Sequence, residues 1–388
     1  MIIKYFTDND LYKFTTMNAI QKLYPNARVR YSFINRGHTF FPDGFESTLR
    51  KEVDNVTGIA LNKEEERFLK SRCYYFDPVF IDLLKGYRFD PGEVTIGVHD
   101  GRLSVEIEGL WYRTVLWEVP LLATISELYY RMAGDKAREV EERAARKALK
   151  LKGMKAEYSD FGTRRRFSFD VHDRVIKTLK TVSGKYFKGT SNVYLAMKHN
   201  LTPIGTHPHE WFMFHASQYG YRSANARALD AWVSVYKGEL GIALSDTFTS
   251  DDFFKSFSRL HAKLFDGIRH DSGDPIVFID KALKYYKDNC IDPVTKTIVF
   301  SNALNPDSIR KIKKHANGRI HDVYGIGTYL TNDVGAKPLD IVIKMIAAKP
   351  DSKNRYQPVI KLSDDAGKQT GPPDEIKICR KLLDLDGS

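Results

Sequence analysis

The sequence is poor in cysteine and lacks long hydrophobic runs, and both shortages narrow the classes of protein that it can encode. Three cysteines in 388 residues are too few to staple a secreted disulfide scaffold of this length. No stretch approaches the roughly 18 consecutive apolar residues that a membrane-spanning helix needs. The N-terminus, MIIKYFTDNDLY, has no basic segment followed by an apolar one, which is the pattern of a secretory signal peptide. These absences favour a cytoplasmic protein with reduced cysteines.

Apolar side chains are nonetheless abundant enough to build a core. The apolar fraction is 42% and the charged fraction 28%, close to the averages for soluble globular proteins, so a disordered chain is excluded. At roughly 100–200 residues per domain, the length predicts two or three domains. We predict an N-terminal α+β domain over residues 1–125 and a catalytic α/β barrel domain with a C-terminal extension over residues 126–388.

The formal net charge of +11 is compatible with nucleic acid, a membrane surface or small anions as partners. Residues 134–152 carry both signs at helical spacing, which is typical of a solvated helix face. The basic cluster at 164–166 instead follows a glycine turn and forms a tight local site. We therefore predict a phosphate-rich small molecule as the ligand, without nucleic acid or membrane partners. A nucleic-acid-binding protein is the alternative, and steeply salt-dependent DNA binding would support it.

The pattern of apolar residues predicts two regions that differ in their secondary structure. Helices are predicted over residues 8–24, 63–71 and much of 119–152, and strands over 27–35, 93–98 and 102–108. From about residue 154, short apolar runs end in small polar clusters and precede helical stretches, as in GIALSD (241–246), TIVFSN (297–302) and VYGIGT (323–328). Seven such units, with further strands predicted at 340–347 and 358–363, indicate parallel strands with helices between them. We predict an α/β fold with an irregular barrel, and an open doubly wound sheet is the alternative.

In such barrels the active site is built at the C-terminal ends of the strands. One of these ends, Gly325-Ile326-Gly327-Thr328, is a glycine turn whose backbone N–H groups suit a phosphate. Ser301 and Asn302 end the neighbouring run and provide a second wall. A short Gly-x-Gly is also a common plain turn. Neither a P-loop nor a dinucleotide-binding glycine motif is present in the sequence.

Three histidines, His207, His209 and His215, raise the alternative of a zinc site. Their spacing argues against it, because a helical zinc motif needs two histidines four residues apart. A single histidine at a strand end and helix start, His209, is better interpreted as an acid, a base or a nucleophile. The alternative for this residue is a purely structural role in helix capping or packing.

Two further clusters carry charge next to turns. In Arg269-His270-Asp271-Ser272-Gly273, the arginine fork suits a carboxylate or phosphate, and Asp271 suits ribose hydroxyls or Mg²⁺. No metal site made by protein ligands alone is predicted. In Asp160-Phe161-Gly162-Thr163-Arg164, a planar ring can stack on Phe161 while Arg164 holds an anion. Local ion pairs within turns are the alternative for both clusters.

Taken together, these motifs resemble the nicotinate phosphoribosyltransferase family. The resemblance runs from about residue 7 to about residue 365, through TDNDLYKFTTMNAI, DFGTRRRFSFD, FKGTSNVYLA, PIGTHPHEWF, LGIALSDTF, GIRHDSGDP, VFSNAL, YGIGTYLTND, PLDIVIK and KLSDD. Relatives that use nicotinamide usually carry Asp where this chain has Ser191, so the serine favours nicotinate. The nicotinamide- and quinolinate-using counterparts are the alternatives. Departures from the family pattern are His207-Pro208 before the histidine, and Met213 and Ser217 after it.

The resemblance implies a reaction and a place for each residue. Nicotinate and 5-phosphoribosyl-1-pyrophosphate would give nicotinate mononucleotide and pyrophosphate in NAD salvage, coupled to ATP hydrolysis through a phosphohistidine at His209. ATP and Mg²⁺ are the implied cofactors, and the implied assembly is a homodimer with shared active sites and the N-terminal domain in its interface. The implied catalytic residues are His209, Asp246 and Asp271. The implied substrate-binding residues are Tyr12 (stacking on the pyridine from the partner subunit), Phe161, Arg164, Ser191, Thr206, Arg269, Ser301, Asn302, Gly325, Gly327 and Thr328.

Overall fold

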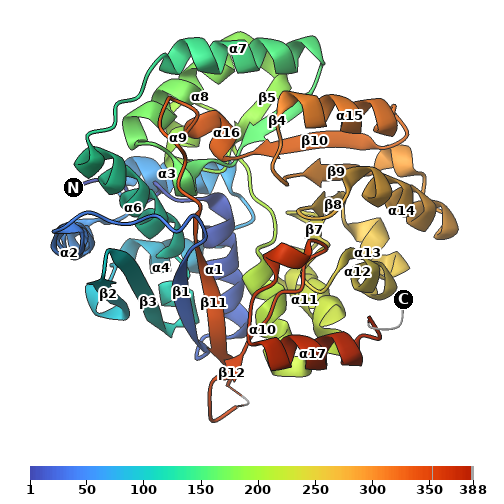
Figure 1. Cartoon of the computed structure of the whole chain (residues 1–388). Coiled ribbons are helices and arrows are strands. Elements are labelled where there is room, and N and C mark those ends of the chain that lie inside the picture. The colour runs from blue at the N-terminus through green and yellow to red at the C-terminus, as the bar shows by residue number, and fades with distance from the viewer. Residues whose placement is uncertain (352, 386–388) are drawn as a thin grey trace. The chain divides into compact units, whose positions relative to one another are not determined.

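The computed structural model describes residues 1–351 and 353–385 (Figure 1). The chain passes repeatedly between two compact units, each of which is described by itself. The first unit comprises Met1–Asn18, Arg30–Gly205 and Ile326–Lys344, and the second comprises Ala19–Val29, Thr206–Gly325 and Met345–Ser388. The predicted domain boundary at residues 125 and 126 stays a prediction.

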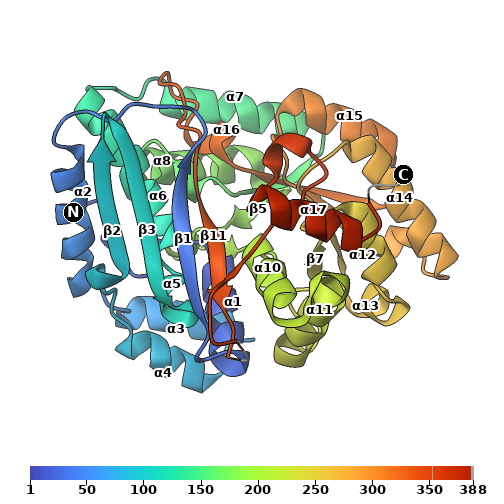
Figure 2. The same ribbon diagram turned by 60° about the horizontal axis from the view of Figure 1, so that its bottom comes forward.

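The first unit contains an antiparallel layer in which β1 (Arg28–Asn35), β3 (Arg102–Leu110) and β2 (Val94–His99) lie side by side (Figure 2). Strands β2 and β3 pair in register from Val94 opposite Ile107 to His99 opposite Arg102. Alternate residues of β3 are buried, so one face of this layer packs on the core while the other meets water. The accompanying helices are α1 (Leu11–Leu23, which continues into the second unit), α2 (Phe45–Asn55), α3 (Lys63–Arg72), α4 (Pro78–Gly86), α5 (Trp111–Thr114), α6 (Glu118–Ala133) and α7 (Val140–Gly153).

The same unit contains three short parallel strands in the order β6 (Thr202–Pro203), β5 (Phe187–Thr190) and β4 (Glu157–Asp160). Helix α8 (Phe169–Ser183) follows β4, α9 (Val193–Lys198) follows β5, and α16 (Thr328–Thr331) closes the returning segment. Close pairing explains the glycine in β5, because a Cβ at Gly189 would collide with the carbonyl oxygen of Thr202.

The second unit contains four parallel strands in the order β10 (His321–Ile326), β9 (Thr297–Phe300), β8 (Gly267–His270) and β7 (Ile242–Leu244). Most of their apolar residues, such as Ile268 and Ile298, are buried, as expected for strands covered on both faces. The helices around them are α10 (His209–Tyr219), α11 (Tyr221–Tyr236), α12 (Ser250–Ser256), α13 (Arg259–Leu264), α14 (Pro275–Asp288), α15 (Pro306–Ala316) and α17 (Pro373–Leu382). Strand β11 (Ile341–Lys349) enters this unit and pairs with β12 (Gln357–Pro358).

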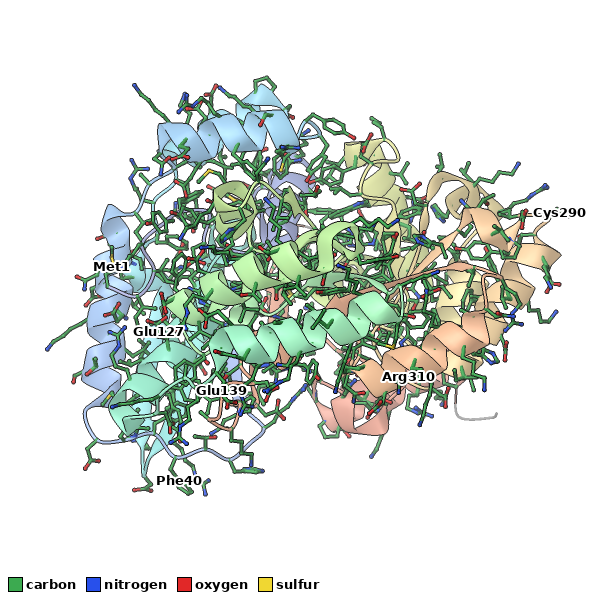
Figure 3. All side chains as sticks on the ribbon, turned by 90° about the horizontal axis from the view of Figure 1, so that it is seen from above. Met1, Phe40, Glu127, Glu139, Cys290 and Arg310 are labelled. Atoms are coloured by element: carbon green, nitrogen blue, oxygen red, sulfur yellow. The ribbon has the colours of Figure 1, made fainter. Side chains whose placement is uncertain are left out.

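The predicted α/β fold class, with an irregular parallel barrel sheet and an antiparallel N-terminal part, is confirmed. The strand predicted over 358–363 is wrong: β12 ends at Pro358, and Lys361 forms only an isolated bridge with Thr370. No helix of the described residues is long and apolar enough to cross a membrane. The three cysteines are free thiols, and Cys290 is exposed near the edge of the view in Figure 3.

Candidate functional site

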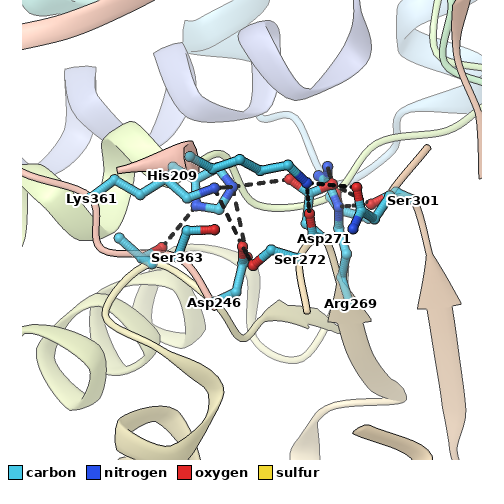
Figure 4. A network of polar contacts seen from close by, with 12 residues as sticks. His209, Asp246, Arg269, Asp271, Ser272, Ser301, Lys361 and Ser363 are labelled. Carbon is cyan, nitrogen blue, oxygen red and sulfur yellow. Dashed lines mark hydrogen bonds and ion pairs between the residues drawn. The ribbon is translucent and has the colours of Figure 1, made fainter. Parts of the chain in front are cut away.

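His209 is the first residue of α10 and faces polar groups on both sides of its ring (Figure 4). Its Nδ1 lies 3.0 Å from Thr247 Oγ1, while its Nε2 lies 2.9 Å from Lys361 Nζ and 3.1 Å from Asp271 Oδ2. The side chain is 21% exposed, so a ligand can reach it. Burial lowers the pKa of His209 below its ordinary value, and the Lys361 ammonium acts in the same direction. The ring is therefore neutral at physiological pH and keeps one nitrogen lone pair.

Two aspartates at neighbouring strand ends face this imidazole. Asp246 follows β7 and is 1% exposed; its Oδ2 accepts a 2.6 Å hydrogen bond from Ser272, and its Oδ1 lies 3.7 Å from His209 Nε2. Among the described residues, that Oδ1 has no hydrogen-bond partner. Burial alone would raise the pKa of Asp246, but the Lys361 ammonium and the hydrogen bond from Ser272 oppose it, and the pKa is lowered. Both aspartates therefore remain charged beside a neutral ring, because the pKa of Asp271 is lowered as well.

Arg269, in β8, connects three of the predicted residues. Its Nε donates to Ser301 Oγ at 2.8 Å, one terminal nitrogen donates to Thr206 Oγ1 at 2.7 Å, and the other donates to Asp271 Oδ1 at 2.9 Å. Burial would raise the pKa of Asp271, but the Arg269 guanidinium and the nearby Lys361 ammonium hold it well below its usual range. All three guanidinium nitrogens are thus committed, and the carboxylate orientation is fixed.

Sequence reasoning did not assign two lysines that belong to this cluster. Lys361 Nζ lies 2.9 Å from His209 Nε2 and 3.3 Å from Asp246 Oδ2. Lys368 Nζ donates to Asn302 Oδ1 at 2.6 Å and pairs with Asp365 at 2.9 Å. The signal was present, because Lys361, the first residue of KLSDD, interrupts the apolar run Val359–Leu362, and a lysine buried there needs a partner.

The donor atoms of His209, Asp246 and Asp271 lie within 4.8 Å of one another, a spacing that could hold a metal ion. The three histidines of the zinc alternative face different partners. His207 packs against Trp232, with ring centroids 4.4 Å apart, and His215 uses its two nitrogens on Trp211 O and Tyr24 Oη. Their arrangement does not form a three-histidine zinc site.

The first unit holds a second polar cluster around Glu118. Tyr12 Oη donates to Glu118 Oε2 at 3.2 Å, and Arg164 donates to Glu118 Oε1 at 3.2 Å. Burial would raise the pKa of Glu118, but Lys13 and Arg164 outweigh it and lower the pKa. Ser191 follows β5 and donates to Asp10 Oδ1 at 2.7 Å.

Two turns of the first unit lie next to each other at the predicted glycine motif. Phe161 N donates to Ile326 O at 2.8 Å, and a Cβ at Gly327 would come 3.3 Å from Phe161 O. Gly325 lies inside β10, whereas Gly327 precedes the short helix α16, which begins at Thr328.

The first unit also contains two fully buried pairs of polar side chains. Arg166 binds Asp8 through two hydrogen bonds of 2.6 and 2.7 Å, and neither side chain is exposed. His172 Nε2 lies 2.7 Å from Asp160 Oδ2, and both side chains are again fully buried.

The structure thus divides the predicted site residues between the two units. The roles of the individual residues stay predictions. The first unit holds Tyr12, Phe161, Arg164, Ser191, Gly327 and Thr328, and the second holds Thr206, His209, Asp246, Arg269, Asp271, Ser301, Asn302 and Gly325.

Comparison with protein families gives two matches that together cover most of the chain. Residues 7–126 match the nicotinate phosphoribosyltransferase N-terminal domain, and residues 156–385 match the nicotinate phosphoribosyltransferase family.

Individual relatives match over nearly their whole length. The nicotinate phosphoribosyltransferase of Chromohalobacter salexigens is 51% identical, with 97% of each chain covered, and that of Desulforapulum autotrophicum is 49% identical, with 99% of each covered. The crystal structure of nicotinate phosphoribosyltransferase from Porphyromonas gingivalis superposes with a TM-score of 0.96 at 45% identity, covering 99% of this chain and all of that one.

Proposed function

This chain belongs to the nicotinate phosphoribosyltransferase family, and we propose that it joins nicotinate to 5-phosphoribosyl-1-pyrophosphate, with ATP hydrolysis coupled through a phosphohistidine at His209. The products are nicotinate mononucleotide and pyrophosphate, which places the enzyme in NAD biosynthesis. The name of the family supports a pentosyltransferase, and the residues around His209 support the coupling step.

The observation that carries the coupling is a neutral, partly exposed imidazole held between cation and carboxylates. A ring nitrogen attacks the γ-phosphorus of ATP, the N–P bond forms as the bond to the bridging oxygen breaks, and ADP leaves with the electron pair. The other ring nitrogen keeps its proton, so the step needs no external base. The positive charge that develops on the ring is stabilised by Asp246 and Asp271.

Ribosyl transfer uses the same strand ends. The donor C1–O bond breaks with positive charge on the ribose and negative charge on pyrophosphate, so carboxylates and cations are both needed. Asp271 is the carboxylate for the ribose, and Arg269 holds that carboxylate in place and adds positive charge for an anionic group. The unpartnered Oδ1 of buried Asp246 and the Oδ2 of Asp271 are hard oxygen donors that fit Mg²⁺. When bound, Mg²⁺ supplies neutralisation of phosphate charge.

The remaining features of the proposal concern the pyridine and the assembly. Ring stacking on Phe161, with Tyr12 supplied by a second subunit of a homodimer, holds the pyridine nitrogen in line with C1. Ser191 selects the carboxylate of nicotinate. A cytoplasmic location completes the proposal.

The test compares His209→Asn with His172→Asn, two substitutions of a histidine that faces an aspartate. We expect His209→Asn to abolish ³²P incorporation from γ-labelled ATP and ATP-stimulated product formation, with the melting temperature retained. His172→Asn should retain both activities and lower the free energy of unfolding by about 1–3 kcal/mol, because Asp160 loses a buried partner.

The substrate is tested with nicotinate, nicotinamide and quinolinate in parallel. Turnover of nicotinate well above the other two supports the proposal, and preference for either alternative overturns it. Persistent ³²P labelling of the His209→Asn protein would place the phosphoryl group elsewhere.

A further inference from the structure

Lys361 is held rigidly although its segment is irregular. Its backbone N–H and C=O both bond to Thr370 at 2.9 Å, and the next residue, Leu362, donates to Thr247 O at 2.8 Å. Thr247 is also the residue whose hydroxyl faces His209 Nδ1. The side chain is 8% exposed. The segment therefore places the Lys361 ammonium beside Nε2 of His209. The same segment is bonded to Thr247, whose hydroxyl faces Nδ1 of that ring.

The other cations of the cluster are already committed. Arg269 uses its three nitrogens on Ser301, Thr206 and Asp271, and Lys368 bonds Asn302 and Asp365. Lys361 faces a neutral nitrogen and one carboxylate oxygen at 3.3 Å, longer than the 2.7–2.9 Å or so that a charge-assisted hydrogen bond prefers. Of these three cations, Lys361 is therefore the one whose interaction energy would increase most if an anion were bound beside it.

A phosphoryl group on His209 creates that need. It adds about two negative charges beside Asp246 and Asp271, and the repulsion would disfavour the N–P bond unless a cation accompanies it. Lys361 already lies within hydrogen-bond distance of Nε2, so a small movement of its flexible stem brings it to the phosphoryl oxygens.

We propose that Lys361 is a catalytic residue of the coupling step: it caps the imidazole in the resting enzyme and transfers its hydrogen bond to the phosphoryl group when His209 is phosphorylated. The inference rests on the proposed phosphohistidine. The N–P bond forms and ADP leaves as described above, and Lys361 keeps its proton throughout. The chain thereby carries a built-in counter-ion for its phosphorylated state, supplied by the KLSDD segment.

The test measures the equilibrium between free enzyme with ATP and phosphoenzyme with ADP, from ³²P labelling at fixed ATP to ADP ratios. Lys361→Met, which keeps length and removes charge, should lower the ratio of phosphoenzyme to free enzyme by about 10- to 100-fold. Lys361→Arg should stay within several-fold of the wild type. Lys361→Gln keeps a hydrogen-bond donor without charge and should behave like the methionine variant.

Lys296→Met is the matched control. Lys296 is a similarly buried lysine of the same unit whose Nζ donates to the carbonyl oxygen of Phe265 at 2.7 Å. Its loss should lower the melting temperature and leave the phosphoenzyme ratio unchanged.

The outcomes separate this inference from the proposed function. If the wild type forms no phosphoenzyme, the coupling fails and this inference fails with it. If the wild type is phosphorylated and Lys361→Met reaches the same ratio, only the inference is overturned. A wild-type ratio in Lys361→Gln would likewise overturn it, because a hydrogen bond alone would then suffice.

Discussion

A histidine faces an aspartate at the carboxyl end of parallel strands in both units, yet the two pairs have different surroundings. His172 and Asp160 lie 2.7 Å apart and are fully buried, and Thr190 and Gly162 N donate to the remaining positions of the carboxylate. His209 and Asp271 lie 3.1 Å apart, and each side chain is 21% exposed. The first pair fastens α8 to the end of β4, whereas the second is open to a reactant.

The arginine–aspartate pairs of the two units repeat this contrast. Arg166 binds Asp8 through both terminal nitrogens in the core, and Asn192 donates to the same carboxylate. Arg269 donates to Asp271 through only one nitrogen, and its side chain remains partly exposed. The two pairs differ in burial: fully buried opposite charges stabilise the structure, while partly exposed charges can contact a ligand.

The largest expected effect tests the buried side of this comparison. Asp8→Ala should lower the free energy of unfolding by about 3–5 kcal/mol, because the Arg166 guanidinium is left buried without a counter-charge. Urea denaturation measures it. Glu141→Ala removes an equally bidentate but exposed partner, that of Arg174, and should cost at most about 1 kcal/mol. Equal losses in the two variants would remove burial as the deciding difference.

A smaller effect is expected from isosteric removal of charge in the open cluster. Asp246→Asn should slow phosphoenzyme formation by about 10²-fold, because the ring loses the carboxylate that stabilises its developing charge. Asp160→Asn should change that rate by no more than several-fold and reduce stability instead. Quenched-flow labelling gives the rate, and thermal unfolding gives the stability. An equal loss of rate in Asp246→Asn and Asp160→Asn would contradict the proposed difference between the partly exposed and the buried cluster.

The smallest effect concerns pH. A histidine in water titrates near pH 6.5, and burial with Lys361 lowers the pKa of His209 below that value. Phosphoenzyme formation should therefore persist as the pH falls through 6.5 and decline only at lower pH, where the ring gains its proton. The same protonation is disfavoured by the folded state, so His209 reduces stability at acid pH. A rate that halves near pH 6.5 or above would contradict the lowered pKa.

The sequence predicts much of the framework because its periodicity and turn residues agree. The helix predicted over 63–71 is α3, which begins after the capping box of Asn62 and Glu65, and the strand predicted over 102–108 is β3 with its alternating burial. The strand predicted over 358–363 fails because Val359, Ile360 and Leu362 are buried in a segment that pairs only through the isolated bridge of Lys361 with Thr370.

The polar cluster around His209 is predictable only in part. Asp246 and Asp271 follow strand ends and His209 begins a helix, where polar residues are easily noticed in the sequence. Lys361 and Lys368 come from an irregular segment, and no local pattern states which strand end they reach. Only the tertiary structure shows that Lys361 meets an imidazole and that Lys368 meets Asn302.

The separation of 152 residues between His209 and Lys361 has a consequence for biosynthesis. At about 5–20 residues per second, a ribosome needs roughly 8–30 s to travel from one codon to the other. During that interval the nascent chain contains His209 but not yet the Lys361 ammonium that lies beside it. Under the proposed coupling, a phosphorylated His209 would therefore gain its counter-ion only after nearly the entire chain has been translated, and a product that stops before residue 361 would lack it.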